Sequence, residues 1–262
     1  MRQDAIRPVY LSPHLDDVAL ACGGLVHQQA QTGLMPLVIT CFAGIPDYGA
    51  LSPFAAEQHR QWGQSEAPVE RRRCENSAAM SLLGAECEHW DGLDCIYRRD
   101  RESGEFFYAS EESLFGDIRV EESDLCDRLT TKLSGAFSPD DALLYAPLAV
   151  GHHVDHQIVL KAALRLRSTG FTVFFYEDYP YAEDAQTLDQ ALQSWVARPV
   201  AIVRTLDEKD VEAKIAAIRV YRSQLDTLFG GDAAVASRVR SYALAIGSGS
   251  ACGERYWQRG TR

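Results

Sequence analysis

Two short stretches of the chain carry the side chains that could perform chemistry. Residues 12–17 read Ser-Pro-His-Leu-Asp-Asp, and residues 151–157 read Gly-His-His-Val-Asp-His-Gln. A buried carboxylate is costly without a partner, so the adjacent Asp16 and Asp17 require a positive charge, and a divalent cation is the simplest one. Imidazole nitrogens together with one carboxylate oxygen are a standard set of zinc ligands. The two stretches therefore predict a metal site.

The chemistry that such a site would perform is hydrolysis. A zinc ion with three protein ligands keeps a fourth position for water, which marks a catalytic site rather than a structural one. Zinc lowers the pKa of that water to about 7, so the water becomes a nucleophile near neutral pH.

Each stretch also has an ordinary structural explanation. His14 could cap the helix that follows it, and Asp16 or Asp17 could be N-cap residues, a position that aspartate favours. A surface cluster could account for His152, His153 and His156. These explanations weaken when the stretches are taken together, because each one directly follows a predicted strand.

The elements that position the two stretches are predicted from apolar runs. Strand-like and helix-like runs alternate, which indicates a Rossmann-like, three-layer α/β fold with a mostly parallel central sheet and helices on both faces. Ligands of such sheets bind at the carboxyl ends of the strands. The strands Pro8–Ser12 and Ala142–Pro147 end just before the two stretches, so the stretches meet if these strands are neighbours.

The remaining predicted elements fill one domain over residues 1–262, with a smaller C-terminal helical and strand portion at about 177–262. Further strands are predicted at Leu37–Phe42, Glu86–Trp90, Phe171–Tyr176 and Pro199–Arg204. Helices are predicted at Asp16–Thr32, Pro68–Leu83, Glu121–Ser134, Val154–Ser168 and Asp207–Ser223. Two long segments, Ala43–Ser65 and Asp91–Gly116, show no clear period and are predicted as loops.

Composition excludes several function classes. The net charge of −11 argues against a protein that wraps nucleic acid by neutralising phosphates. No apolar run approaches the ~20 residues of a transmembrane helix, and the first residues form no apolar secretory segment. The seven cysteines include no Cys-x-x-Cys pair, which favours a reducing cytoplasm. A homo-oligomer is left open.

The two stretches resemble the signature loops of the LmbE-like, or PIG-L, family of zinc-dependent N-deacetylases. The family's usual motifs are His-Pro-Asp-Asp and His-Pro-Asp-His, and this chain has Leu15 and Val154 at the proline positions. The segment ERRRCENSAAMSLLGA is similar to the family's Arg-x-x-Glu helix, with Arg72 and Glu75 in the matching places. The segment KIAAIRVYRSQ is similar to one near the family's C-terminus.

The resemblance implies a role for each residue of the two stretches. His14, Asp17 and His156 would bind one Zn²⁺ per chain. Asp16 would be the general base, because a carboxylate beside the metal ligands keeps its lone pairs free. His153, in its protonated form, would stabilise the oxyanion or give a proton to the leaving amine, and Asp155 would hydrogen-bond its ring.

Substrate contacts are expected from residues outside the two stretches. Arg72 would clamp a hydroxyl, phosphate or carboxylate, although the cluster Arg71-Arg72-Arg73 could equally be a solvated helix face with an ion pair to Glu70 or Glu75. By the resemblance, Asp94 would bind sugar hydroxyls, although it could also be a plain loop residue. Some family members have a tyrosine where this chain has Gly151, so Tyr179 or Tyr181 would have to supply that group.

The predicted function is zinc-dependent removal of an N-acyl group, most often acetyl, from an amino sugar such as N-acetylglucosamine or its conjugate. Two alternatives remain. One is a metal-dependent hydrolase of another bond, such as a phosphoester. The other is a non-catalytic sugar- or nucleotide-binding module on the same scaffold.

Overall fold

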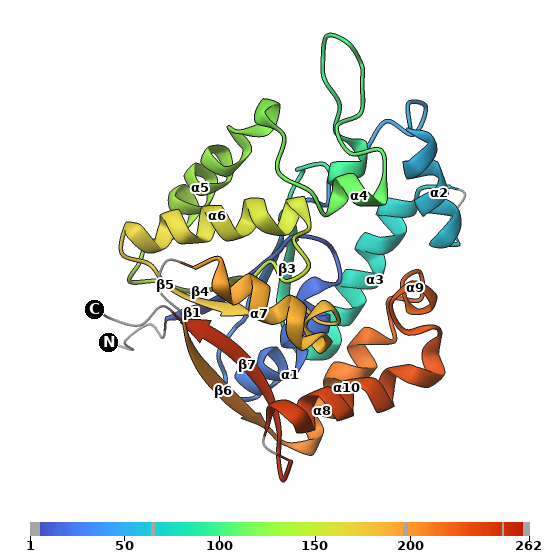
Figure 1. The fold of residues 1–262 in the computed structure, drawn as a ribbon. Helices are drawn as coiled ribbons and strands as arrows, with labels where there is room; N and C mark the ends of the chain where they lie inside the picture. The colour runs from blue at the N-terminus through green and yellow to red at the C-terminus, as the bar shows by residue number, and fades with distance from the viewer. Residues whose placement is uncertain (1–5, 64–65, 196–198, 248, 259–262) are drawn as a thin grey trace.

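A seven-stranded sheet forms the centre of the molecule (Figure 1). The computed structural model describes residues 6–63, 66–195, 199–247 and 249–258. The strand order is β3-β2-β1-β4-β5-β7-β6, and among the described strands β7 alone runs in the direction opposite to all the others. The strands are β1 (Arg7–Ser12), β2 (Leu37–Thr40), β3 (Glu86–His89), β4 (Ala142–Pro147), β5 (Thr172–Tyr176), β6 (Val200–Leu206) and β7 (Cys252–Gln258). The prediction of a mostly parallel sheet is confirmed.

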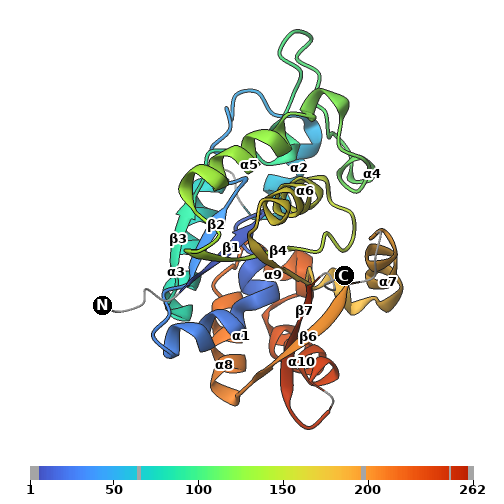
Figure 2. The same cartoon turned by 90° about the vertical axis from the view of Figure 1, so that its left-hand side faces the viewer.

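Helices cover both faces of this sheet, which gives the three expected layers (Figures 1 and 2). One face packs against α5 (Leu125–Ala136), α6 (Val154–Ser168) and α7 (Ala185–Gln193). The other packs against α1 (Asp17–Gln31), α3 (Pro68–Leu83) and α8 (Glu208–Ile218). The shorter or outer helices are α2 (Pro53–Gln61), α4 (Glu111–Leu114), α9 (Leu225–Phe229) and α10 (Asp232–Ile246), with 3₁₀ turns η1 (Cys95–Tyr97), η2 (Val120–Glu122) and η3 (Tyr181–Glu183).

Strand β1 is buried on both sides because its side chains alternate between the two layers. Val9 and Leu11 belong to the core under α5 and α6, whereas Tyr10 faces α1 and α3. Tyr10 stacks on Tyr145 of β4, with ring centroids 4.3 Å apart. This packing holds β1 and β4 side by side, which is the relationship that the site needs.

Helix α1 lies close to α8 and β6 because it carries glycine at its middle. A Cβ on Gly24 would lie 2.4 Å from Leu206 Cδ1, so a larger residue would separate the helix from β6. Gly23 approaches Lys214 in the same way, at 3.0 Å.

The structure adds elements that the sequence reading did not predict. Helix α2 lies inside the segment predicted as the loop Ala43–Ser65, and α4, α7, α9, α10 and β7 were not predicted. Residues 64–65, at the end of that loop, lie outside the described residues. In the part of the chain that is described, no helix combines the length and apolar content needed to cross a membrane.

Candidate metal centre and active site

The two chemistry-bearing stretches meet at the carboxyl edge of the sheet. Strands β1 and β4 are parallel neighbours, with Tyr10 opposite Tyr145, so the loops that follow them lie together. The ring centroid of His14 lies 4.8 Å from that of His153 and 5.3 Å from that of His156. The expected convergence of residues 14–17 with residues 153–156 is confirmed.

Asp17 directs one carboxylate oxygen toward a ring nitrogen of each histidine that is predicted to bind the metal. Oδ2 of Asp17 lies 3.5 Å from Nδ1 of His14 and 3.4 Å from Nε2 of His156. Tetrahedral zinc with bonds of 2.0–2.2 Å places its ligand atoms about 3.3–3.5 Å apart. The distance of Asp17 from each of the two histidines is therefore compatible with a shared zinc ion.

Each imidazole of this set has a carboxylate behind it. Nε2 of His14 lies 3.0 Å from Oδ2 of Asp155, and Nδ1 of His156 lies 2.6 Å from Oδ1 of Asp178. Such carboxylates fix the tautomer and the orientation of a histidine that binds metal. The sequence reading missed Asp178, although Asp178 follows β5 as the two stretches follow β1 and β4.

The electrostatics of the centre favour a bound positive charge. Burial disfavours the charged form of His14, yet the carboxylates of Asp94, Asp155 and Asp17 outweigh it and raise the pKa of His14 to about 9. Burial also opposes charge on His156, and Asp17 and Asp178 raise its pKa. A site that stabilises an extra proton on its imidazoles is also electrostatically suited to a cation.

Other sets of donor atoms adjoin the same centre. Ring nitrogens of His14, His153 and His156 lie within 4.8 Å of one another. Cys95 forms a similar group with His153 and Asp155, as does Asp94 with His14 and Asp155.

Asp16 lies against Arg72 in the interior. Nη2 of Arg72 is 3.3 Å from Oδ1 of Asp16, and the guanidinium lies 4.7 Å from the ring centre of Trp62. Burial raises the pKa of Asp16, and Arg72 opposes this rise. Asp16 is the N-cap residue of α1 but makes no side-chain capping hydrogen bond, so capping does not explain its carboxylate. Arg72 is buried, so the solvated-face explanation does not describe it.

His153 and Asp155 interact differently from the expectation. The Asp155 backbone N–H donates to Nδ1 of His153 over 3.3 Å, so Nδ1 is unprotonated. Burial and the neighbouring His14 hold the pKa of His153 well below its ordinary value. The Asp155 carboxylate contacts His14, the Cys95 N–H and Arg98, rather than the ring of His153. The hydrogen bond at Nδ1 and the lowered pKa both favour the neutral form of His153 over the protonated form that the resemblance implies.

A cavity of about 280 Å³ opens onto these residues. Asp94 lines it with an oxygen 3.8 Å from Nε2 of His14, and it also caps η1 by accepting from the Ile96 N–H. An apolar and aromatic wall is supplied by Leu20, Phe54, Trp62, Ile96, Leu114, Phe115, Tyr179, Tyr181 and Leu228. The cavity thus combines the polar groups of the centre with an apolar and aromatic lining, as small-molecule sites commonly do.

Tyr181 occupies the space that a side chain at position 151 would need. Gly151 has φ 89°, and a Cβ there would lie 3.2 Å from the ring of Tyr181. The ring of Tyr181 therefore lies beside position 151, where some family members have a tyrosine. His152 is exposed, and its Nδ1 lies 3.2 Å from the backbone oxygen of Phe115, outside the metal centre.

Comparison with known proteins gives consistent matches. Residues 9–167 match the PIG-L family, described as GlcNAc-PI de-N-acetylase. A 2'-N-acetylparomamine deacetylase of Niallia circulans is 30% identical over 251 residues, which cover 89% of this chain and 86% of that protein. A zinc-inhibited form of a teicoplanin deacetylase superposes with a TM-score of 0.82 at 29% identity, over 96% of this chain and 97% of the other. A deacetylase of the A40926 pseudoaglycone gives a TM-score of 0.77 at 27% identity, over 97% of each chain.

Proposed function

Because the chain belongs to the PIG-L family, we propose that the centre formed by residues 14–17 and 153–156 hydrolyses the N-acetyl group of an amino sugar or its conjugate. The enzyme is an amide hydrolase of this family, which contains the deacetylases that it resembles. The observation that carries the assignment to this centre is the position of Asp17, whose Oδ2 lies within 3.5 Å of one nitrogen on each of His14 and His156.

His14, Asp17 and His156 would hold one Zn²⁺. When bound, zinc polarises the amide carbonyl of the substrate and lowers the pKa of a water molecule at the site. Both flanking carboxylates, Asp155 and Asp178, keep the two imidazoles turned toward Asp17.

Asp16 would accept the proton from the attacking water. Its burial raises its pKa, which brings its basicity closer to that needed near neutral pH. Arg72 holds the carboxylate in place from one oxygen. The proton that Asp16 accepts is then available to the leaving amine, which would otherwise depart as an unstable anion.

His153 would stabilise the charge that develops on the substrate carbonyl oxygen. Because Nδ1 accepts a hydrogen bond from the Asp155 N–H, the neutral ring carries its proton on Nε2. His153 lines the cavity, so this N–H would act as a neutral donor to the oxyanion. Asp155 would act on His14 and, through its backbone, on His153.

The substrate class is supported by the cavity and by the names of the relatives. Arg72 is paired with Asp16, while Asp94 and Glu111 also line the cavity, so a phosphate would meet more negative than positive charge. Sugar hydroxyls and ammonium groups suit such a lining. Relatives named for 2'-N-acetylparomamine and teicoplanin indicate an N-acetylated amino sugar joined to a larger group, and Asp94 and Arg72 would contact its hydroxyls.

Acetate release from N-acetylglucosamine conjugates tests the proposal. We expect Asp16→Asn to lower kcat by about 10²–10⁴-fold while zinc content stays near one per chain, because only the base is lost. His14→Ala should lose both activity and zinc. Asp91→Asn, which changes an exposed carboxylate outside the cavity, is the matched control and should keep both. Full activity in Asp16→Asn and His14→Ala would contradict the assignment.

A further inference from the structure

Asp155, Arg98 and Glu122 form a buried network of ion pairs through Oδ1 of Asp155. Oδ2 of Asp155 faces His14 and the Cys95 N–H, whereas Oδ1 lies 2.6 Å from Nη1 of Arg98. Nε and Nη2 of Arg98 lie 2.5 and 3.2 Å from the two oxygens of Glu122. Asp155, Arg98 and Glu122 are 0%, 8% and 5% exposed, so this network is shielded from water.

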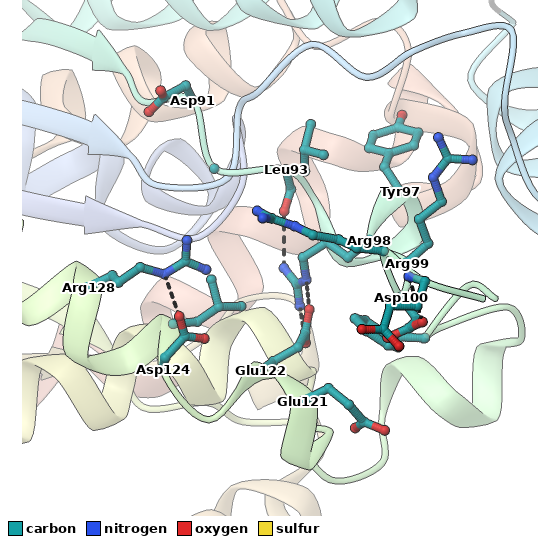
Figure 3. A pocket seen from close by; sticks show the side chains of 15 residues that line it. Asp91, Leu93, Tyr97, Arg98, Arg99, Asp100, Glu121, Glu122, Asp124 and Arg128 are labelled. Atoms are coloured by element: carbon teal, nitrogen blue, oxygen red, sulfur yellow. Dashed lines mark hydrogen bonds and ion pairs between the residues drawn. The ribbon is translucent and has the colours of Figure 1, made fainter. Parts of the chain in front are cut away.

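The network is rigidly held from several directions. The Tyr108 hydroxyl donates to Glu122 over 2.8 Å, and Arg98 donates to the backbone oxygen of Leu93 over 3.1 Å. Figure 3 shows the Arg98 guanidinium between Leu93 and Glu122. Arg98 and Glu122 line a pocket that, among the described residues, shares no lining residue with the substrate cavity. The planar guanidinium contacts both carboxylates at once, which the point charge of a lysine cannot do in the same geometry.

This arrangement has a direct consequence for His14. Each oxygen of Asp155 has a partner: Oδ1 accepts from Arg98, and Oδ2 contacts Nε2 of His14. The carboxylate therefore cannot rotate without breaking a charged hydrogen bond. The orientation of His14 depends in turn on Asp155, since Nε2 contacts that carboxylate and Nδ1 faces Asp17. Arg98 thus acts on His14 without touching it.

We propose that Arg98, held by Glu122, is a positioning residue for the metal centre: it fixes the Asp155 carboxylate so that Nδ1 of His14 stays directed at the position shared with Asp17 and His156. The inference rests on the proposed function, because it takes His14 as a metal ligand. A purely structural role is the alternative, since breaking any buried ion pair lowers stability.

Zinc affinity separates the two roles. The dissociation constant of zinc is measured by competition with a chromogenic chelator for the wild type and for Arg98→Met, Arg98→Lys and Lys214→Met. Lys214 forms a buried ion pair with Glu254 at 2.8 Å and contacts the Ala21 backbone oxygen, so Lys214→Met breaks a comparable pair elsewhere. Unfolding by urea reports the stability of each variant.

We expect Arg98→Met to raise the dissociation constant of zinc about 10–100-fold, the range for loss of a group that orients a metal ligand. Arg98→Lys should raise the dissociation constant less, because lysine keeps the positive charge but cannot donate to both carboxylates in the same geometry. With Lys214→Met, stability should fall while zinc affinity stays within about twofold of wild type. At saturating zinc, Arg98→Met should recover part of the lost kcat.

Wild-type zinc affinity in a folded Arg98→Met chain would overturn the proposal. If Arg98→Met does not fold, Arg98→Lys decides, and an unchanged dissociation constant overturns it. An equal loss of zinc affinity in Lys214→Met would assign the effect to general stability and also overturn it. A wild type that binds zinc but releases no acetate would refute the deacetylase function alone, since the affinity comparison does not require turnover.

Discussion

Glu75 of α3 and Ser223, which follows α8, meet in the interior although they lie far apart in the chain. The Ser223 hydroxyl donates to Oε2 of Glu75 over 2.6 Å, and its backbone N–H donates to Oε1 over 3.2 Å. Helix α3 also carries Arg72, and Gln224, next to Ser223, lines the cavity. The contact therefore ties the helix that holds Arg72 to the wall of the substrate site.

Loss of the Ser223 hydroxyl should weaken the contact between Ser223 and Glu75 and lower the stability of the protein. Ser223→Ala leaves the buried Glu75 carboxylate without one donor, and we expect the free energy of unfolding to fall by about 1–3 kcal/mol. Urea unfolding measures this. Ser237→Ala removes an exposed hydroxyl on α10 and should change stability by less than about 0.5 kcal/mol. Equal effects of the two substitutions would contradict the role given to Glu75.

Removing Asp178 should weaken zinc binding. The Asp178 carboxylate fixes Nδ1 of His156, so Asp178→Ala should raise the dissociation constant of zinc about 10–100-fold. Asp178→Asn keeps an acceptor of the same shape and should give an intermediate value. Chelator competition measures both variants, and a dissociation constant that does not change in Asp178→Ala would exclude the orienting role.

Removing Arg72 should change the pH dependence of catalysis. Burial raises the pKa of Asp16 and Arg72 gives the largest opposing effect, so Arg72→Met should raise the pKa of Asp16 further. Asp16 then stays protonated, and unable to accept a proton, up to a higher pH. The acidic limb of the kcat/KM profile should therefore move to higher pH. Arg71 is exposed, so Arg71→Met is the control, and its pH profile should match that of the wild type. An acidic limb that keeps its pH or moves to lower pH in Arg72→Met would refute Asp16 as the base.

A side chain at position 151 should disturb Tyr181. Gly151→Ala forces alanine into φ 89° and places its Cβ against the tyrosine ring, so we expect a loss of about 1–3 kcal/mol in unfolding free energy. KM should rise as well, because Tyr181 lines the cavity. Gly135→Ala is the matched control: it lies near the end of α5 with open space around it, and it should change the unfolding free energy by less than about 0.5 kcal/mol. If Gly151→Ala changes neither the unfolding free energy nor KM, the Tyr181 ring moves aside without cost and the prediction is wrong.

The sequence predicts the central part of the fold well, for a local reason. Helices α3 and α6 and strand β4 begin and end where the sequence reading placed them, since proline, glycine and apolar runs mark their ends. The meeting of His14 with His156 was also predictable, because parallel strands bring their carboxyl ends to one edge.

Contacts between distant segments were not predictable in the same way. Arg98 lies in a segment without periodicity, and nothing local indicates that it reaches Asp155 and Glu122. Helix α2 was missed because it buries little apolar surface, although Ser52 and Pro53 mark its start. The hydrogen bond from the Asp155 backbone N–H to the His153 ring was not predictable either, because it depends on His153 being the N-cap residue of α6, which the motif sequence does not indicate.

The placement of β7 has a consequence for how the molecule is made. Strand β7 follows every other described element in the chain, yet it lies between β5 and β6 in the sheet. Its Glu254 accepts hydrogen bonds from the backbone N–H groups of Gly24 and Leu25 in α1. During synthesis, β6 emerges from the ribosome before the strand that joins it to the rest of the sheet exists. Until residues 252–258 arrive, the edge of β5 stays open to pairing with other chains, so stalled or shortened translation products should be the aggregation-prone species.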